Sequence, residues 1–156
     1  MSAKMVKEEL VGDVFERIVT TPAKVSRGQT LKEAVEAILK VPITRKVYVV
    51  DSTGKLEGVI KVETILRHAG YRMGVRKSGI ASYFKMLSEV FKDKVEDIME
   101  KPITVTKKDT IARATKLMVE NHLNDLSVVD ENGILIGEIN SMEILSASIK
   151  LFEDKL

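Results

Sequence analysis

Histidine and cysteine supply much of the acid–base, nucleophilic and metal-binding chemistry of proteins, and this chain of 156 residues has few of them. Cysteine is absent, which excludes disulfides, zinc–thiolate sites, iron–sulfur clusters and cysteine nucleophiles together. The two histidines, His68 and His122, are far apart in the sequence, and neither stands in a motif with a carboxylate. The chain also has no P-loop, G-x-G-x-x-G, G-x-S-x-G or H-E-x-x-H motif. We therefore expect a protein that is not an enzyme and that requires no metal or cofactor.

Positive charge is concentrated in one stretch of the chain. Seven lysines and arginines lie between Arg67 and Lys94 against two acidic residues, which gives this stretch about +5 within a net charge of +2. Its first part, residues 67–77, is predicted to be a loop, and residues 80–92 have the spacing of an amphipathic helix. This helix could pack on the rest of the chain as a connector or at a dimer interface. Alternatively, the segment could dock an acidic partner.

A nucleic-acid partner is the third possibility for the basic segment, with Arg72, Arg76 and Lys77 placed on phosphates. No helix-turn-helix, zinc-finger or RNA-binding aromatic motif accompanies these residues. We therefore do not expect nucleic acid to bind.

An internal repeat organises the sequence. The first copy contains Thr30, the run 47–51 (Val-Tyr-Val-Val-Asp), Gly54 and Gly58, and the second contains Thr110, the run 126–130 (Leu-Ser-Val-Val-Asp), Gly133 and Gly137. Upstream, residues 11–16 resemble residues 95–100. So many matches in the same order indicate a duplication.

Each copy predicts the same secondary structure. In the first, Thr30 and Glu33 form a capping box before a helix over 31–39, followed by strands at 47–50 and 56–60 and a helix from 62 to 68. In the second, the corresponding elements are a helix at 111–121, strands at 126–129 and 134–139, and a helix at 142–150. A short strand precedes each main helix, so the unit is β-α-β-β-α. One such unit has too little core to be stable alone, so we expect two to pack together.

The repeated Val-Asp strand ends, the glycine turns and the following Gly-containing strands resemble a tandem pair of CBS domains (the cystathionine-β-synthase type), also called a Bateman module. The resemblance implies an α/β (α+β) fold of two repeats packed with pseudo-two-fold symmetry, with a connecting helix. The domains are then 7–66 for the first repeat, 67–94 for the basic connector and 95–150 for the second repeat. The family pattern also places Thr/Ser-x-x-Asp at the start of the last helix.

The resemblance implies a ligand cleft at the end of the second repeat. After Ile139, Asn140 takes the Thr/Ser position of the family pattern and Glu143 takes the Asp position. In this interpretation, Glu143 accepts hydrogen bonds from ribose hydroxyls, and Asn140 helps to bind phosphate. The same two residues also fit an ordinary capping box, and both interpretations stay open.

In the family, each cleft combines the helix start of one repeat with elements of the other. The Glu143 cleft would therefore recruit residues from two short stretches: Thr20, Thr21 and Pro22, together with Thr44 and Arg45. The guanidinium of Arg45 could contact a phosphate in a forked geometry, or it could be an exposed charge.

The first repeat departs from the family pattern. Lys61 replaces Thr/Ser and Thr64 replaces Asp, and a threonine cannot accept two ribose hydroxyls. We therefore expect no family-style ribose site there, although Lys61 could hold a phosphate. The remaining residues of this possible second cleft would be Met99, Pro102 and Asn124.

By resemblance, the function is that of a regulatory sensor module. It would bind AMP, ADP, ATP or S-adenosylmethionine between the repeats, change their relative orientation and act on an effector protein that the sequence does not identify. A homodimer is expected. The alternative is an interaction or dimerisation module that binds no ligand. No apolar run is long enough for a membrane span and the N-terminus has no signal-peptide pattern, so we expect a cytoplasmic protein.

Overall fold

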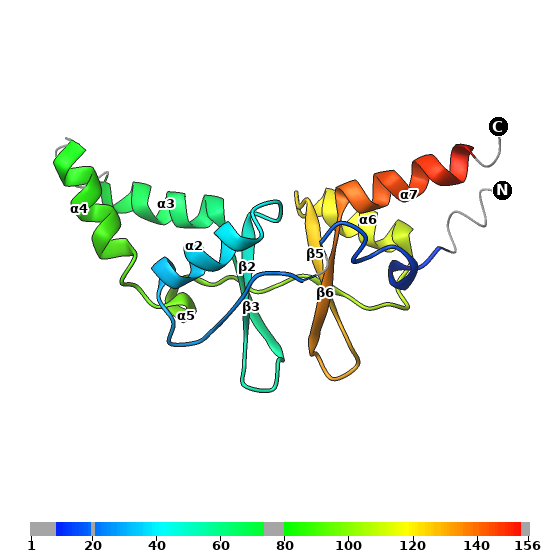
Figure 1. Cartoon of the computed structure of the whole chain (residues 1–156), viewed down its shortest axis with the longest axis horizontal. Helices are drawn as coiled ribbons and strands as arrows, with labels where there is room; N and C mark the ends of the chain where they lie inside the picture. Colours follow the sequence, from blue (N-terminus) through cyan, green and yellow to red (C-terminus); the bar gives the residue numbers. More distant parts are fainter. Residues whose placement is uncertain (1–8, 20, 74–79, 154–156) are drawn as a thin grey trace. The chain divides into compact units, whose positions relative to one another are not determined.

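The computed structural model describes residues 9–19, 21–73 and 80–153, and these fall into two compact units (Figure 1). Unit 1 contains the described parts of Met1–Pro22 and Pro102–Leu156, and unit 2 contains those of Ala23–Lys101. The units therefore do not coincide with the sequence repeats. The segment that precedes the strands of the first repeat packs in unit 1, and the segment that precedes those of the second repeat packs in unit 2; we call these two the exchanged segments. Val11 and Val14 are buried in the core of unit 1, whereas Val95 is buried in the core of unit 2. These apolar side chains determine with which unit each segment packs.

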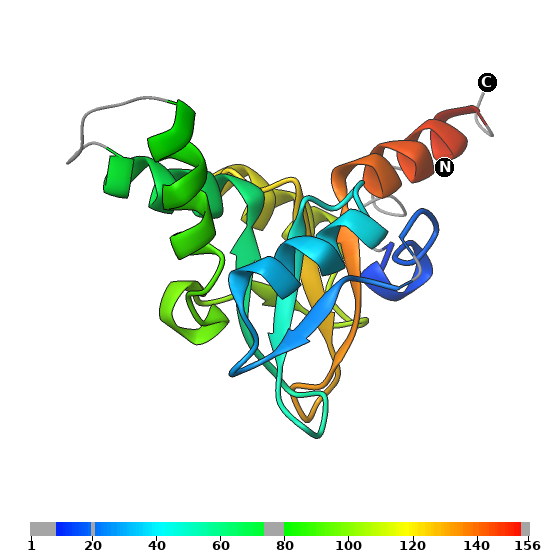
Figure 2. The same cartoon turned by 60° about the vertical axis from the view of Figure 1, so that its left-hand side comes forward.

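Unit 2 is built on a three-stranded sheet of order β1-β2-β3, in which β1 is parallel to β2 and β2 is antiparallel to β3. Helix α2 packs on β1 and β2 (Figure 2). The elements are β1 (Lys24–Ser26), α2 (Leu31–Lys40), β2 (Lys46–Val50), β3 (Leu56–Lys61), α3 (Val62–Met73), α4 (Ile80–Val90) and α5 (Val95–Ile98).

Unit 1 repeats the same topology, with the sheet order β4-β5-β6 and the same parallel and antiparallel pairings. Its elements are the 3-10 helix η1 (Val11–Asp13), β4 (Thr104–Val105), α6 (Ile111–Glu120), β5 (Asp125–Val129), β6 (Leu135–Asn140) and α7 (Ser141–Glu153). The predicted β-α-β-β-α unit is therefore confirmed in both copies.

Local hydrogen bonds explain why the repeated polar residues start helices and turns. The hydroxyl of Thr30 accepts from the N–H of Glu33, and that of Thr110 accepts from the N–H of Arg113. Each satisfies a donor that the first helical turn would otherwise leave unpaired. In the β2–β3 hairpin, one carboxylate oxygen of Asp51 accepts from the N–H groups of Thr53 and Lys55, at 2.8 and 2.9 Å. Asp130 repeats this pattern in the β5–β6 hairpin.

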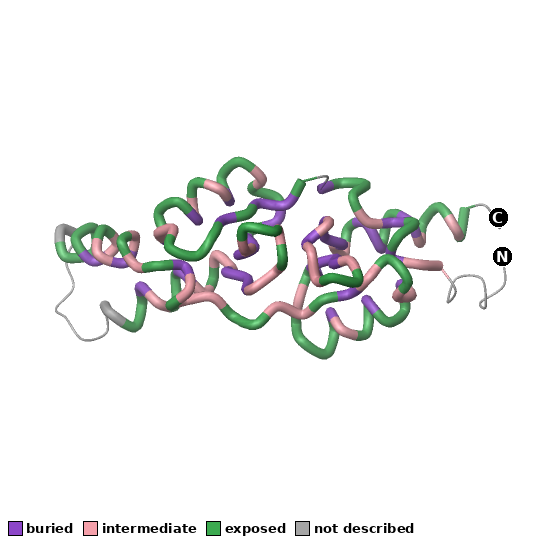
Figure 3. Tube along the Cα trace, turned by 90° about the horizontal axis from the view of Figure 1, so that it is seen from below, coloured by how far each residue is buried: buried purple, intermediate pink, exposed green. Residues whose placement is uncertain are grey.

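Each unit has its own apolar core, formed by the inner side of the sheet and the inward faces of its helices. Figure 3 shows that the trace of the helices alternates between buried and exposed residues. The core of unit 2 includes Leu31, Val47 and Ile60, and that of unit 1 includes Ile111, Leu126 and Ile139. These are corresponding positions of the two repeats, so the duplication preserves the core.

The basic segment differs from its prediction as a loop. Helix α3 continues to Met73, so the prediction is wrong for residues 67–73, while residues 74–77 lie outside the described residues. The helix continues past Gly70 because Ile65 and Ala69 are buried in the core of unit 2, and tertiary packing outweighs the low helix propensity of glycine. The amphipathic helix predicted at 80–92 is present as α4.

Among the described residues, no helix combines the length and the apolar character that crossing a membrane would require.

The Asp51 turn predicts a specific pH dependence. Hydrogen bonds hold the pKa of the Asp51 carboxyl below its usual value. The Thr53 hydroxyl contributes most, and the N–H groups of Lys55 and Thr53 add to the effect. A lowered folded-state pKa gives stability that is present above the unfolded-state pKa of about 3.9 and is lost as the pH falls through the folded-state value. We expect Asp51→Asn to lower the melting temperature near pH 7 and this difference to shrink below about pH 4. Thermal unfolding across pH tests this, with Glu131→Gln as a control for the lost charge, and a difference that grows in acid would contradict it.

Candidate functional site

The junction between β6 and α7 holds the best-defined polar arrangement of unit 1. Asn140 ends β6, and its side-chain oxygen accepts from the N–H of Glu143 at 2.8 Å. In return, one carboxylate oxygen of Glu143 accepts from the N–H of Asn140 at 3.0 Å. The hydrogen bonds of a capping box are thus present at the start of α7.

The second carboxylate oxygen of Glu143 makes a long-range contact. It accepts from the N–H of Ile18 at 2.9 Å, and the Glu143 side chain has no exposed surface. Ile18 follows η1, so this bond joins the N-terminal segment to α7 within unit 1. Sequence reasoning missed Ile18, because a backbone N–H leaves no signal in residue type or spacing.

These bonds define what Glu143 can do as a ligand residue. A carboxylate has about four acceptor positions, so two N–H bonds do not use up its capacity. Its burial is the stronger constraint, since a ribose hydroxyl reaches the carboxylate only if the contact with Ile18 opens. Asn140 and Ser141 are partly exposed at the same helix start. The ribose contact of Glu143 therefore stays a prediction that requires a local rearrangement.

The other residues predicted for this cleft have different environments. Ile139 is buried in the core of unit 1. In the same unit, Thr21 is exposed and Pro22 is buried, while Thr20 lies outside the described residues.

Thr44 and Arg45 belong to unit 2, in the turn before β2. The buried Thr44 hydroxyl lies 3.2 Å from the carbonyl oxygen of Val41 and 3.1 Å from that of Lys46. Arg45 is exposed and has a φ of 54°. Non-glycine residues adopt this left-handed region infrequently. The carbonyl oxygen of Arg45 accepts from the N–H of Val62, which fixes the start of α3.

The equivalent junction of unit 2, between β3 and α3, uses different chemistry. The Thr64 hydroxyl donates to one carboxylate oxygen of Glu100 at 2.5 Å, and the ammonium of Lys61 lies 3.7 Å from the other. Glu100 is held in place by two backbone hydrogen bonds to Val59, of 3.0 and 2.9 Å. Lys61 also lies 3.7 Å from Glu63. Nothing in the residue type or spacing of Glu100 indicates this role, yet Glu100 makes the junction a paired, partly exposed ionic cluster.

The remaining residues of the predicted second cleft fall in both units. Met99 is partly buried against the core of unit 2, while Pro102 and Asn124 belong to unit 1. The carbonyl oxygen of Asn124 accepts from the N–H of Ser141 at 2.8 Å, so its backbone supports the start of α7.

One histidine has a carboxylate partner that its sequence position does not indicate. His68 Nε2 lies 2.8 Å from Asp93 Oδ2, which links α3 to the segment after α4. The expectation that His68 lacks a carboxylate partner therefore holds for its sequence neighbours but not for the fold. His122 is exposed, directly after the C-cap of α6. In the described parts of the chain, no group of three or more His, Cys, Asp or Glu side chains is arranged to hold a metal ion.

The repeated glycines of β3 and β6 are required by close packing. A Cβ on Gly137 would lie 2.8 Å from the ring of Phe15, and a Cβ on Gly58 would lie 2.5 Å from the sulfur of Met99. Phe15 and Met99 occupy matching positions of the two copies, two residues after the end of η1 and one residue after the end of α5. The glycines thus allow each exchanged segment to lie against its sheet.

A family model for the CBS domain matches the chain twice, over residues 11–71 and 95–150. Each of the two α/β repeats is therefore a CBS domain, and the chain belongs to the CBS domain family. It is similar to a CBS domain-containing protein from Thermotoga maritima, with 34% identity and a TM-score of 0.73 over 92% of this chain and 96% of that chain. A CBS domain pair therefore accounts for most of the chain.

Two further solved structures share the fold and contain nucleotides. CBSX2, a CBS-pair protein of Arabidopsis thaliana, in complex with AMP is 22% identical, with a TM-score of 0.70 over 92% of this chain and 98% of that chain. The cytosolic domain of the Mg²⁺ channel MgtE in complex with ATP is 21% identical, with a TM-score of 0.66 over 90% of this chain and 49% of that chain.

An uncharacterized protein of Methanocaldococcus jannaschii is 39% identical over 71 residues, or 45% of this chain. The match spans 42% of that curated relative.

The capping box of α7 predicts a large stability effect. Glu143→Ala leaves the N–H groups of Ile18 and Asn140 without their acceptor, and we expect a loss of about 2–4 kcal/mol in the free energy of unfolding. Urea unfolding measures this loss, and hydrogen exchange at Ile18 should become faster. Glu33→Ala removes the carboxylate of the exposed capping box on α2 and should cost less. Equal losses in the two variants would mean that the buried contact with Ile18 adds nothing.

The close approach at the glycines predicts a second effect. We expect Gly137→Ala and Gly58→Ala each to cost about 1–3 kcal/mol through overpacking. Gly70→Ala is the matched control, because a Cβ there meets nothing within 4 Å, and alanine favours the helix by about 0.5–1 kcal/mol. The cost of Gly58→Ala should shrink in a Met99→Ala background. An unchanged cost in that background would show that the Met99 thioether is not the obstacle, because the Cβ of residue 99, at 2.9 Å, remains in alanine.

Proposed function

We propose that this CBS pair is a regulatory module that binds an adenosine-type ligand at the start of α7. The candidate ligands are AMP, ADP, ATP and S-adenosylmethionine. The observation that carries the proposal is the β6–α7 junction, where the amide of Asn140 and the carboxylate of Glu143 converge on a helix N-terminus. The helix dipole favours phosphate at such a position. The AMP and ATP complexes of other CBS structures add support.

The proposed mechanism is an exchange of hydrogen bonds at Glu143. In the structure, this carboxylate accepts from the N–H of Ile18 at 2.9 Å. A ribose hydroxyl would replace this N–H, so that the buried carboxylate keeps its second donor while the N-terminal segment is released. Occupancy of the site would then change the arrangement of the two units and be transmitted to an effector protein. A ligand shifts such an equilibrium only by its differential affinity for the two states.

Calorimetric titration of the full chain with the four compounds tests this proposal. We expect saturable binding of at least one compound and a weakening of about tenfold or more in Glu143→Gln, since an amide has only one accepting oxygen and cannot accept from both the Asn140 N–H and a ribose hydroxyl. Glu33→Gln makes the same substitution in the α2 capping box and should leave binding unchanged. Arg45→Ala tests the predicted phosphate contact, because it should lower the affinity for AMP more than the affinity for adenosine, which has no phosphate.

Two outcomes would overturn the ligand proposal. If Glu143→Gln binds the ligand as tightly as the natural chain does, the ligand does not bind at the start of α7. If folded protein, as judged by circular dichroism, gives no heat of binding with any of the four compounds, the proposal that the chain binds an adenosine-type ligand is wrong. Hydrogen exchange adds an independent check, because ligand should accelerate exchange at Ile18 while slowing it at the start of α7.

A second candidate function, an interaction module that binds no ligand, is favoured by large apolar side chains on the surfaces of α4 and α7. Phe84 is 64% exposed, and Leu145, Ile149 and Phe152 are 58–59% exposed. On α7 the exposed apolar residues recur at intervals of four and three along the helix, and an exposed apolar helix face commonly marks an interaction site.

A further inference from the structure

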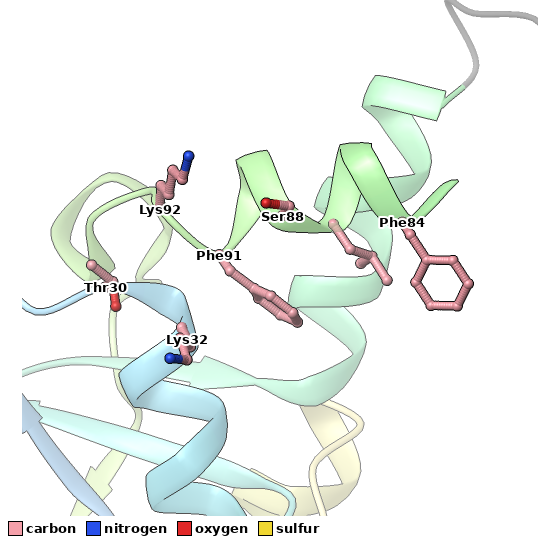
Figure 4. Close-up of a pocket in the computed structure, with 7 residues that line it drawn as sticks. Thr30, Lys32, Phe84, Ser88, Phe91 and Lys92 are labelled. Carbon is pink, nitrogen blue, oxygen red and sulfur yellow. The ribbon is translucent and has the colours of Figure 1, made fainter. Parts of the chain in front are cut away.

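Helix α4 and the start of α2 border a pocket that shares no residue with the polar junctions described above (Figure 4). Its volume is about 510 Å³, within the range of roughly 300–1,000 Å³ that small-molecule sites occupy. All of its lining residues belong to unit 2. We call it the α4 pocket.

The repeated fold does not require this pocket. Helix α4 has no equivalent among the described elements of unit 1. At the start of the main helix, Thr30 matches Thr110, so the lysine at position 32 matches Ala112 in the second copy. The pocket therefore belongs to the part of the chain that the duplication does not explain.

Two backbone hydrogen bonds fasten the end of α4 to the start of α2. The carbonyl oxygen of Phe91 accepts from the N–H of Lys32 at 3.1 Å, and that of Asp93 accepts from the N–H of Leu31 at 2.9 Å. Val90 has no exposed surface and packs in the core of unit 2. These bonds use the first N–H groups of α2, so an anion in the pocket must be bound by side chains. They also form the pocket in advance, which lowers the ordering cost of binding.

One side of the α4 pocket is an apolar wall. Phe84, Leu87 and Phe91 line it at intervals of three and four residues. Phe84 is 64% exposed, and Leu87 and Phe91 are partly exposed. An extended apolar group that covers this wall removes apolar surface from water on both partners, which is favourable.

Positive charge is gathered at one end of the wall. Figure 4 shows Lys32 and Lys92 at the end near Thr30 and Phe84 at the other end. The ammonium of Lys32 lies 3.7 Å from Glu36 on the exposed surface, where an ion pair contributes little. Lys92 forms no ion pair with any residue that the structure describes. Both ammonium groups can therefore bind an anion at this end.

We propose that the α4 pocket binds a free straight-chain carboxylate, such as decanoate. Its alkyl chain lies along Phe84, Leu87 and Phe91, and its carboxylate accepts hydrogen bonds from the ammonium groups of Lys32 and Lys92. An ammonium is a donor only, so it suits a carboxylate and repels a cationic head group. This site is separate from the start of α7, and it does not depend on the adenosine-type ligand proposed above.

Calorimetric titration of the full chain with octanoate, decanoate and dodecanoate, each below its micelle-forming concentration, tests the proposal. We expect the affinity to rise by about twofold to fourfold for each added CH2 group. Decanol and decyltrimethylammonium have the same chain without the carboxylate and should bind about fivefold or more weakly than decanoate. Changes in backbone amide NMR shifts on adding decanoate should be concentrated in residues 30–32 and 84–92.

Two pairs of variants locate the site. Phe84→Ser should weaken decanoate about fivefold, whereas Phe152→Ser removes a phenylalanine that is 58% exposed on α7 and should have no effect. Lys32→Met should weaken decanoate about threefold and leave decanol unchanged. Lys116→Met is its control, because Lys116 is similarly exposed and lies 3.8 Å from Glu120 on α6. The substituted side chains are exposed, so melting temperatures should change little.

Four outcomes would overturn the proposal. Equal affinity for the three decyl compounds would show that the lysines do not select a carboxylate. Equal losses in Phe84→Ser and Phe152→Ser would show that alkyl chains bind to any exposed apolar residue. Sedimentation with phosphatidylglycerol vesicles without binding of free decanoate would indicate a lipid surface instead. Absence of saturable binding by all three carboxylates would leave the pocket to another occupant, such as an acidic segment of a partner protein.

One further variant separates this proposal from the adenosine site. Glu143→Gln should leave the affinity for decanoate unchanged, because Glu143 belongs to unit 1. A loss of decanoate binding in this variant would contradict a site in the α4 pocket.

Discussion

A single buried carboxylate connects three parts of unit 1. Glu143 accepts the N–H of Ile18 with one oxygen and the N–H of Asn140 with the other, and it has no exposed surface. A buried N–H that loses its acceptor costs about 1–3 kcal/mol, so the two contacts support each other. They fix the end of β6, the start of α7 and the N-terminal segment together. Any ligand that uses this carboxylate must therefore compete with the contact that holds the N-terminal segment.

The duplication preserves the cores while it allows the polar junctions to diverge. At the matching junction of unit 2, Thr64 stands where Glu143 stands in unit 1, and the carboxylate comes instead from Glu100. The roles are thus exchanged, because the helix supplies the acceptor in unit 1 and the hydroxyl donor in unit 2. Lys61 further offsets the charge of Glu100. The two junctions are chemically unequal, which is why we assign the ligand to one of them.

The outer helix faces follow from the same architecture. Each sheet needs only one face of each helix to complete its core, and α4 and α7 satisfy this with small or medium side chains such as Ala147 and Val90. Their other faces are nevertheless apolar, with Phe84 and Phe152 largely exposed. The core of either unit does not require these side chains, so binding explains them better than folding does.

The sequence by itself determined the repeated β-α-β-β-α elements and their order, because the signals involved are local. The Thr30 cap, the Asp51 turn and the apolar periodicity of each helix depend on residues within a few positions of one another. It also offered a helix start as one of two interpretations of Asn140 and Glu143. Only the tertiary structure decided which distant groups meet: Ile18 and Glu143 are 125 residues apart, Thr64 and Glu100 36, and His68 and Asp93 25. The continuation of α3 past Gly70 likewise depends on burial of Ala69 in a core that the whole unit forms. Long-range partners are chosen by packing, and packing has no fixed spacing along the chain.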